Sequence, residues 1–336
     1  MIGTPRSILV INVTRIGDTL LATPALRALA KRWPEAKITV LAHPNRAEVL
    51  EHLPFLHAVG TIEKKRAVLM GRMPGRSYDL ALVYGHDAAL VEYALRVAKR
   101  VVAFRQEDHG LNDRLSLAVE EAKPYSEHAV HGALRLVRAL GVEPAGLRLA
   151  FEVTPEEQGE ARARLRTLEM DRASPRIGLK VVSFPTKAYR DWPLECFEEL
   201  CRRVRARWPG AGFIIFAGPD EKDMVRGLVD RLGAPAVQLA GLSLRAAGAM
   251  MAELDAYVGV DTGPTHIMGT FDVPMVGLYH CLLPRSVYGP LDHPLDFSLD
   301  HPRLGGDCSE STPMAEMTVD MVFNRLQEAL VAGGFR

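Results

Sequence analysis

Residues 256–266 read Ala-Tyr-Val-Gly-Val-Asp-Thr-Gly-Pro-Thr-His and contain the end of a strand followed by the start of a helix. The first five residues are mostly apolar, which is typical of a buried parallel strand. Pro264 comes shortly after the strand, where its fixed φ suits the first turn of a helix. The stretch therefore predicts a β-α unit, the building block of α/β folds.

The same alternation of strand and helix patterns continues on both sides of this stretch. In the first half we expect strands at residues 8–13, 38–41 and 80–84, and helices at 20–31 and 88–98. In the second half we expect strands at 177–182, 213–217, 237–239, 256–260 and 275–278, and helices at 197–207, 224–232 and 246–254. We therefore predict an α/β protein with two Rossmann-like, doubly wound parallel-sheet domains that face each other across a cleft.

The junction between the two halves is expected within residues 153–174. This segment is rich in Glu and Arg, begins with a Thr-Pro-Glu-Glu helix start and ends at a Ser-Pro break. A length of 336 residues also suits two domains. We predict a first domain at 1–160 and a second at 170–336, with a last helix that is free to pack back on the first domain.

Composition excludes several classes of protein. Basic and acidic residues balance at 41 each, which argues against a dedicated nucleic-acid binder. The four cysteines form no Cys-x-x-Cys pair, so we interpret them as free thiols in a reducing compartment. The N-terminus has no signal-peptide pattern, and no apolar run reaches the roughly 18 residues that a membrane span needs. We expect a cytoplasmic protein whose contact with a membrane is at most peripheral.

Ligands of doubly wound sheets bind beyond the carboxyl ends of the strands, so the loops there are the candidate site. In the loop at 261–266, Asp261 is followed by Thr262 and Gly263, which offer a hydroxyl and amides at a positive helix end. These groups suit a phosphate or diphosphate, and His266 adds another donor. The alternative is an ordinary Asp or Thr cap with a proline in the first helical turn.

The loop after the first strand reads Thr-Arg-Ile-Gly-Asp-Thr at residues 14–19. Gly17 is its only glycine, which disfavours the dinucleotide fingerprint and NAD binding. Asp18 lies at a helix start, where it is either an N-cap or a base that takes a proton from an attacking hydroxyl.

Two further loops carry charged residues. At 183–193, Thr186, Lys187 and Arg190 could stabilise a leaving diphosphate without a metal; alternatively, this is a solvated loop in which Trp192 packs as a staple. After the strand at 213–217, Asp220 and Glu221 could accept a hydrogen bond from a ribose hydroxyl, although helix capping explains them nearly as well.

Taken together, these segments resemble glycosyltransferase family nine, the ADP-heptose:lipopolysaccharide heptosyltransferases, over almost the whole chain. The strongest elements are the Gly17-Asp18 turn with the Thr-Pro-Ala-Leu at 23–26, and residues 261–266 followed by Val-Pro at 273–274. Supporting elements are the Arg-Asp-Trp-Pro at 190–193, residues 285–290 and the terminal region 308–330.

The resemblance implies a GT-B fold, with the acceptor bound by the first domain and the nucleotide-sugar donor by the second. It implies transfer of a heptose from ADP-heptose to the inner core of lipopolysaccharide, by metal-independent inverting displacement and with no cofactor. Asp18 would be the base. Thr262, Gly263 and His266 would contact the diphosphate of the donor, and Asp261 would shape that loop. Thr186, Lys187 and Arg190 would lie at the leaving group, and Asp220 or Glu221 would lie at the ribose.

The first half also has a local excess of cations. Residues 60–105 contain nine Lys or Arg and four Asp or Glu. This segment suits an anionic lipopolysaccharide core and peripheral contact with the inner face of the inner membrane, while solvated helix faces are the plain alternative. His128 and His131, with Glu127 nearby, provide too few ligands for a metal site, so we expect surface histidines and no metal.

Two other functions remain open from the residues. A sugar-nucleotide epimerase on the same scaffold would need acid and base groups around one nucleotide sugar and no acceptor site. A non-catalytic nucleotide-sugar binding module would keep the diphosphate loop and perform no transfer. Asp18 argues against both.

Overall fold

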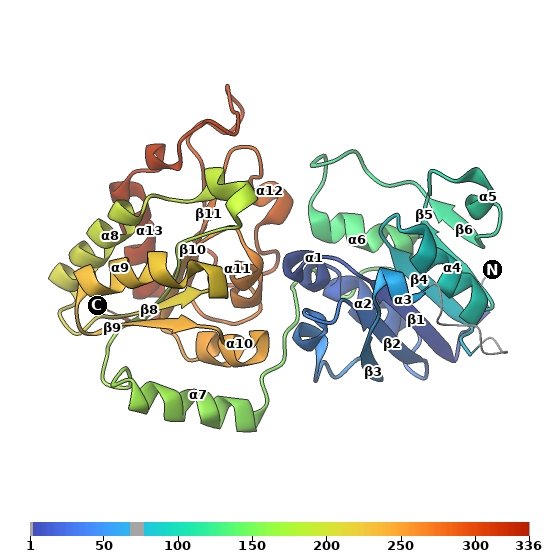
Figure 1. Ribbon diagram of the computed structural model, residues 1–336, viewed down its shortest axis with the longest axis horizontal. Coiled ribbons are helices and arrows are strands. Elements are labelled where there is room, and N and C mark those ends of the chain that lie inside the picture. The colour runs from blue at the N-terminus through green and yellow to red at the C-terminus, as the bar shows by residue number, and fades with distance from the viewer. Residues whose placement is uncertain (1–2, 68–76, 336) are drawn as a thin grey trace. The chain divides into compact units, whose positions relative to one another are not determined.

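The computed structural model describes residues 3–67 and 77–335, and the chain divides into two compact units, Met1–Glu152 and Val153–Arg336 (Figure 1). Each unit is built on a six-stranded parallel sheet. The strand orders are β3-β2-β1-β4-β5-β6 and β12-β11-β10-β7-β8-β9. Numbered within its own unit, each sheet has the doubly wound order 3-2-1-4-5-6. The α/β class and the two Rossmann-like sheets that the sequence predicts are confirmed.

The first unit alternates strands and helices as expected, with additional short elements. Its strands are β1 (Ser7–Asn12), β2 (Lys37–Ala42), β3 (Ala58–Thr61), β4 (Leu80–Tyr84), β5 (Val101–Phe104) and β6 (Leu117–Val119). Its helices are α1 (Ile16–Leu21), α2 (Thr23–Arg32), the 3-10 helix η1 (Ala47–Leu50), α3 (Lys64–Ala67), α4 (Ala88–Val97), α5 (His109–Asn112) and α6 (Ala129–Arg138). Every residue of the central strand β4 is buried, as in a sheet covered on both faces.

One predicted helix of the first unit is in fact two. The pattern at residues 20–31 predicts one helix, but α1 ends at Leu21 and α2 begins at Thr23. Pro24 has no N–H to donate to the carbonyl of Leu20, which is four residues earlier. The hydroxyl of Thr23 donates to that carbonyl instead, at 2.6 Å. The break thus follows from the Thr-Pro pair.

The second unit has the longer list of elements. Its strands are β7 (Arg176–Lys180), β8 (Gly212–Ala217), β9 (Ala236–Ala240), β10 (Ala256–Val260), β11 (Met275–Tyr279) and β12 (Leu299–Asp300). Its helices are α7 (Pro155–Thr167), η2 (Pro185–Arg190), α8 (Leu194–Arg207), η3 (Pro219–Glu221), α9 (Lys222–Leu232), α10 (Leu244–Ala252), α11 (Gly263–Met268), α12 (Arg285–Tyr288), η4 (Met314–Glu316) and α13 (Val319–Ala332). Helix α7 begins with the expected cap, because Thr154 and Glu157 form a capping box.

The core of the second unit includes the final helix. Helix α13 packs on α8, β10 and β11 and belongs to the second unit. Trp192 is 1% exposed; its ring packs edge-on against Phe197, and its Nε1 donates to the carbonyl of Met317 at 2.7 Å. Trp192 is therefore a packing residue that joins the start of α8 to the segment before α13.

The order of the strands determines where a ligand of the second unit would bind. Strands β7 and β10 are neighbours at the centre of the sheet. From β7 the chain proceeds to β8 and β9 at one edge, and from β10 it proceeds to β11 and β12 at the other. The carboxyl ends of β7 and β10 therefore flank a switch point, which is the usual ligand crevice of such sheets. Among the described residues no helix is both long and apolar enough to cross a bilayer.

Candidate functional site

Residues from the two loops at this switch point meet around one carboxylate. Asp261 follows β10, and its Oδ2 accepts from Nη1 of Arg190 at 2.8 Å, while its Oδ1 lies 3.5 Å from Nε2 of His266. Arg190 comes from the loop after β7 and His266 from the first turns of α11. The structure thus brings Arg190 to Asp261 and His266, which the sequence predicted in a different loop.

Hydrogen bonds of Thr265 hold the loop that carries Asp261 in place. The hydroxyl of Thr265 donates to the carbonyl of Val260 at 2.6 Å and lies 3.0 Å from the hydroxyl of the buried Tyr257. Thr262 is the N-cap residue of α11, but its side chain makes no capping hydrogen bond. The interpretation of Thr262 as a residue whose side chain caps the helix is therefore wrong. Pro264 has no N–H, but the other amides at the start of α11, those of Gly263 and Thr265, have no acceptor within the helix, which suits an anion.

Arg190 has an unusual set of partners for a buried cation. Its side chain is 14% exposed, and Nη1 also approaches the carbonyl of Asp261 at 3.4 Å. Its Nε is buried and has no hydrogen-bond partner among the described residues. Buried donors are nearly always satisfied, so this N–H is suited to an acceptor on a ligand.

Lys187 and Thr186 lie farther out on the same 3-10 helix. The ammonium of Lys187 is 3.9 Å from a carboxylate oxygen of Glu310, and its side chain is 30% exposed. Thr186 is exposed. Both cations approach the ring of Tyr189: the Lys187 ammonium lies 5.5 Å from its centroid and the Arg190 guanidinium 5.7 Å. The two cations that sequence spacing could not distinguish therefore occupy different environments.

The two carboxylates after β8 are also distinct. Glu221 forms an ion pair with Lys180 and accepts from the backbone N–H of Gly218 at 2.7 Å, while Asp220 is exposed. Glu221 is thus held in the loop as a structural acceptor, and Asp220 is the one that faces solvent. The assignment of a ribose-binding residue stays a prediction.

Lys180 and Asp191 are the charged residues here that the sequence analysis missed. Lys180 ends the buried strand β7 with a side chain 5% exposed. Burial lowers the pKa of Lys180, against the opposing effect of Glu221. Burial likewise raises the pKa of Asp191, whose carboxylate accepts from the backbone N–H of Ser183 at 2.7 Å. The signal in the sequence that could have identified Lys180 is a lysine at the end of an apolar strand.

Asp18, the predicted base, belongs to the first unit. It is the third residue of α1 and is exposed. The N-cap of α1 is Arg15, and no side chain caps the helix, so the interpretation of Asp18 as an N-cap is wrong. A carboxylate in the first turn is nevertheless favoured by the helix dipole. Its role as a base stays a prediction.

Comparison with known proteins identifies the family. Residues 69–293, more than half of the chain, match Glycosyltransferase family 9 (heptosyltransferase). The chain belongs to glycosyltransferase family 9. Lipopolysaccharide heptosyltransferase 3 of Escherichia coli is 26% identical over 282 residues, which cover 78% of this chain and 80% of that protein. Lipopolysaccharide core heptosyltransferase OpsX of Haemophilus influenzae is 19% identical over 299 residues, with 86% and 84% covered.

Solved structures share the fold of this glycosyltransferase. The glycosyl transferase family 9 structure from Veillonella parvula superposes with a TM-score of 0.83 at 19% identity and covers 99% of both chains. ADP-heptose lps heptosyltransferase II of E. coli superposes with a TM-score of 0.79 at 19% identity and covers 98% of this chain and 99% of that one. The predicted GT-B fold, family and enzyme class are therefore confirmed.

The excess of cations at residues 60–105 of the glycosyltransferase is partly neutralised by acidic partners. Lys64 lies 3.1 Å from Asp87, and Lys99 lies 2.8 Å from Asp79. Arg96 and Arg105 are likewise paired with glutamates. Arg72 and Arg76 lie outside the described residues. The alternative of solvated, ion-paired faces therefore describes at least four of the nine cations.

Two predictions about histidines and cysteines are wrong. His128 is 6% exposed because it caps α6, and its Nδ1 accepts from the N–H of Val130 at 3.1 Å. Cys281 and Cys308 form a disulfide, whereas the sequence suggested four free thiols; Cys196 and Cys201 are free. The disulfide partners are 27 residues apart, and only the fold brings them together.

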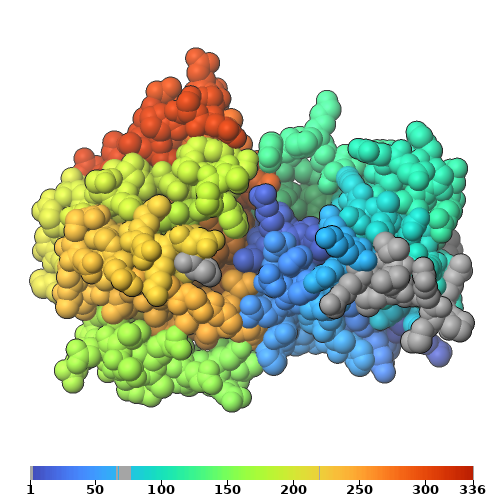
Figure 2. All heavy atoms as spheres, in the orientation of Figure 1, coloured from blue at the N-terminus to red at the C-terminus, as the bar shows by residue number. Residues whose placement is uncertain are grey.

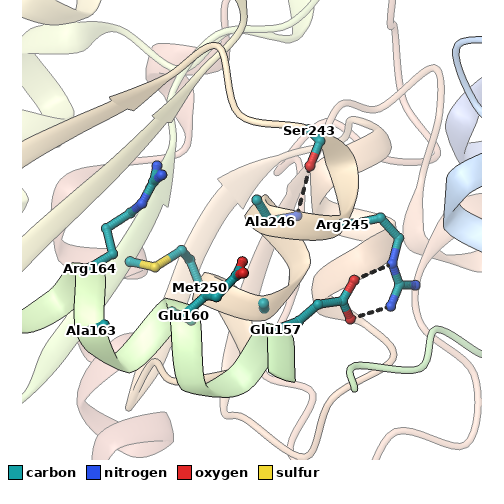
Figure 3. A pocket seen from close by; sticks show the side chains of 10 residues that line it. Glu157, Glu160, Ala163, Arg164, Ser243, Arg245, Ala246 and Met250 are labelled. Carbon is teal, nitrogen blue, oxygen red and sulfur yellow. Dashed lines mark hydrogen bonds and ion pairs between the residues drawn. The ribbon is translucent and has the colours of Figure 1, made fainter. Parts of the chain in front are cut away.

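A hollow of about 400 Å³ lies between α7 and α10, away from the predicted residues (Figure 3). On its wall, Arg245 donates from Nε to Glu157 at 2.7 Å and makes a second bond from Nη2 (Figure 3). Through these two charge-assisted hydrogen bonds the guanidinium on α10 and the carboxylate on α7 link the two helices. We assign the pair a structural role, because each charge is satisfied by the other.

Proposed function

We propose that this glycosyltransferase moves a heptose from ADP-heptose to the inner core of lipopolysaccharide, by metal-independent displacement with inversion. The observation that carries the proposal is the meeting of Arg190, Asp261 and His266 at the start of α11. A largely buried arginine that contacts the residue just before the cap of α11, and whose Nε has no partner among the described residues, matches the needs of a diphosphate. The relatives named as lipopolysaccharide heptosyltransferases support the sugar and the acceptor, and E. coli heptosyltransferase WaaC was solved with ADP.

In the proposed reaction an acceptor hydroxyl oxygen attacks the anomeric carbon of the donor. Asp18 takes the proton of that hydroxyl, and the bond from the anomeric carbon to the diphosphate oxygen breaks. The electron pair of that bond leaves on ADP. Arg190 and the amides of α11 stabilise the new charge, while Lys187 supplies a second, more exposed cation.

The proposal includes peripheral contact with the inner face of a membrane. The acceptor would be an anionic lipid, which brings the enzyme to a membrane surface. The acidic partners of Lys64, Arg96, Lys99 and Arg105 reduce the electrostatic attraction that the raw count of cations suggests.

The proposal is tested by ADP release from ADP-heptose, with and without truncated core lipopolysaccharide. We expect release that requires the acceptor. Asp18→Asn should lower the turnover by roughly 100-fold or more, because loss of a general base typically costs 10²–10⁴ in rate. Glu35→Gln, which removes an exposed carboxylate from the same unit, is the matched control and should leave turnover unchanged.

Each alternative function gives a different result in this assay. A product that forms without acceptor would indicate an epimerase. Tight ADP binding without turnover on any acceptor would indicate a binding module. Full activity of Asp18→Asn would remove the base assignment while leaving the transferase function in place. A screen of other nucleotide sugars then tests the donor.

A further inference from the structure

A histidine and two cysteines lie together at the end of β11, outside the site described above. We call His280, Cys281 and Cys308 the Cys-His cluster. One ligand atom from each residue, an imidazole nitrogen or a sulfur, lies within 4.8 Å of the others. The two sulfurs are joined in the disulfide, and Nδ1 of His280 is 3.9 Å from the sulfur of Cys281. Two sulfurs and an imidazole form a donor set that soft divalent cations prefer.

The imidazole of His280 is oriented like that of a metal ligand. Its ring is fully buried, and Nε2 lies 3.1 Å from the carbonyl oxygen of Thr312. A carbonyl only accepts, so Nε2 carries the hydrogen and Nδ1 presents its lone pair on the side of the sulfurs. Histidines that bind metals usually donate their other N–H to a carbonyl or carboxylate in this way. With the disulfide closed, that lone pair accepts a hydrogen bond from the N–H of Leu282 at 3.2 Å, and an ion bound at Nδ1 would replace this hydrogen bond.

One of the three residues of the cluster, Cys308, borders a hollow on the surface. A hollow of about 430 Å³ is lined by residues 303, 307–309 and 311–313, and Cys308 is among them. Cys308 is only partly buried, and the segment that carries it projects from the second unit, as the orange-red atoms show (Figure 2). The sulfur of Cys308 can therefore be reached without unfolding the sheet.

We propose that the Cys-His cluster, once its disulfide is reduced, binds a soft divalent cation such as Zn²⁺ through both thiolates and Nδ1 of His280. A dithiol reductant supplies the two electrons: the bond between the sulfurs breaks, two cysteine thiols form and the dithiol closes into a disulfide. Binding of the ion then releases the two thiol protons. Water completes a four-coordinate site. The disulfide and the bound ion are alternative closures of the same loop.

The cluster lies beside the residues proposed to hold the leaving group. The ring of Tyr189 packs edge-on against His280, with ring centroids 4.9 Å apart, and both Lys187 and Arg190 approach the same Tyr189 ring. Either closure keeps the segment around Cys308 attached to the end of β11. The ion thus has a structural role, and no step of the transfer passes through it.

The test uses the full-length enzyme and Co²⁺ as a spectroscopic probe. The protein is treated with a dithiol, the reductant is removed under nitrogen, and thiols are counted in denaturant. We expect two thiols before treatment and four after it, because two of the four cysteines are bonded to each other. The folded, reduced enzyme should then bind one Co²⁺ with thiolate charge-transfer absorption, and Zn²⁺ should displace it. Air oxidation should release the ion.

Variants locate the site. Cys308→Ser and His280→Ala should each weaken Co²⁺ binding at least tenfold, and Cys308→Ser should reduce the charge-transfer intensity by about half. Cys196→Ser, at a half-buried free cysteine, should bind like the wild type. Because Cys308 lies on a projecting segment, its serine variant should fold, which circular dichroism checks.

Three results would overturn the proposal. One is a reduced enzyme with four thiols that binds no Co²⁺. Another is binding that Cys308→Ser leaves unchanged. The third is a disulfide that the folded enzyme retains in excess dithiol. The assay contains no nucleotide sugar and no acceptor, so its outcome is independent of the proposed transfer reaction.

Discussion

Arg190 and Lys187 are two cations on one 3-10 helix, yet their surroundings predict unequal effects when each is removed. Arg190→Ala would remove a buried donor and leave the Asp261 carboxylate without its closest cation. We expect kcat/KM for the nucleotide sugar to fall roughly 100-fold or more, as when a preorganised donor is lost. Lys187→Ala, at a more exposed site, should cost about tenfold or less. Steady-state kinetics with varied donor checks both values.

The conservative variant Arg190→Lys separates charge from geometry. A lysine keeps the charge but lacks the planar fork that contacts Asp261 and presents Nε. We expect it to restore only part of the activity lost in Arg190→Ala. Equal losses for Arg190→Ala and Lys187→Ala would contradict the distinction that we draw between the two cations.

Lys180 supports the same loops through a buried ion pair. Lys180→Met removes the ammonium but keeps the length of the side chain, and it leaves Glu221 partly buried without a counter-charge. Breaking such a pair from one side typically costs about 3 kcal/mol or more, so the urea midpoint of unfolding should fall clearly. Lys99→Met is the control, because the Lys99 side chain is 62% exposed and its pair with Asp79 should contribute less than about 1 kcal/mol. Similar losses for both variants would refute the prediction.

Single residues could be predicted from the sequence where their role follows from their neighbours along the chain. Asp261, Thr262 and His266 were selected because they sit together after one strand. Their contact with Arg190 could only be expected from the rule that ligands gather at the ends of strands. The Cys281–Cys308 bond could not be predicted, since its partners meet only after β11, β12 and the projecting segment have folded.

The ion pair between Arg245 and Glu157 links two helices of the second unit and makes the stability of the fold depend on pH. Hydrogen bonds from Arg245 on α10 hold the pKa of Glu157 on α7 near 2, below its usual value of 4.5. A carboxylate with a lowered folded-state pKa stabilises the fold above its unfolded pKa. That contribution is lost as the pH falls from about 4.5 to about 2.

Glu157→Gln tests this link between helices. At about pH 7 the variant should be less stable by at most about 2 kcal/mol, because solvent partly screens the pair. Towards about pH 2 the difference should vanish, since wild-type Glu157 is then protonating. Thermal unfolding across this pH range provides the measurement. Arg162→Met, which removes a more exposed pair with Glu253, is the control. A difference that stays constant with pH would rule out the ionic contribution.

Elements were predicted well where one pattern dominates and poorly where two compete. The long apolar alternation gave the buried strands β4, β8 and β10 at or close to their observed bounds. The amphipathic period at residues 20–31 hid the break at Ala22, because the apolar spacing continues across it; Pro24, which suits a first helical turn and disrupts a helix interior, was the available signal. Short strands such as β6 have too few residues for a periodic signal.

The whole molecule consists of two units, and each has its own buried core. One core gathers apolar residues between positions 9 and 111, and the other gathers residues between positions 177 and 330. The rhythm of strands and helices was sufficient to predict two sheets, because each βαβ unit is a local pattern. Few residues determine which unit binds the donor and which binds the acceptor. That assignment therefore depends on family resemblance and on experiment.

A separately expressed fragment 153–336 should therefore fold and bind ADP. It contains a complete doubly wound sheet, a core that includes α13 and all of the proposed diphosphate residues. We expect a cooperative thermal transition. We also expect the ADP affinity of the fragment to lie within about threefold of that of the full chain, a difference of less than about 1 kcal/mol in the free energy of binding. Calorimetric titration measures the affinity, and the fragment with Arg190→Ala is the control that should lose it. A fragment that unfolds without cooperativity would show that the second core depends on the first unit, whereas a folded fragment without ADP affinity would move the proposed nucleotide site away from Asp261 and α11.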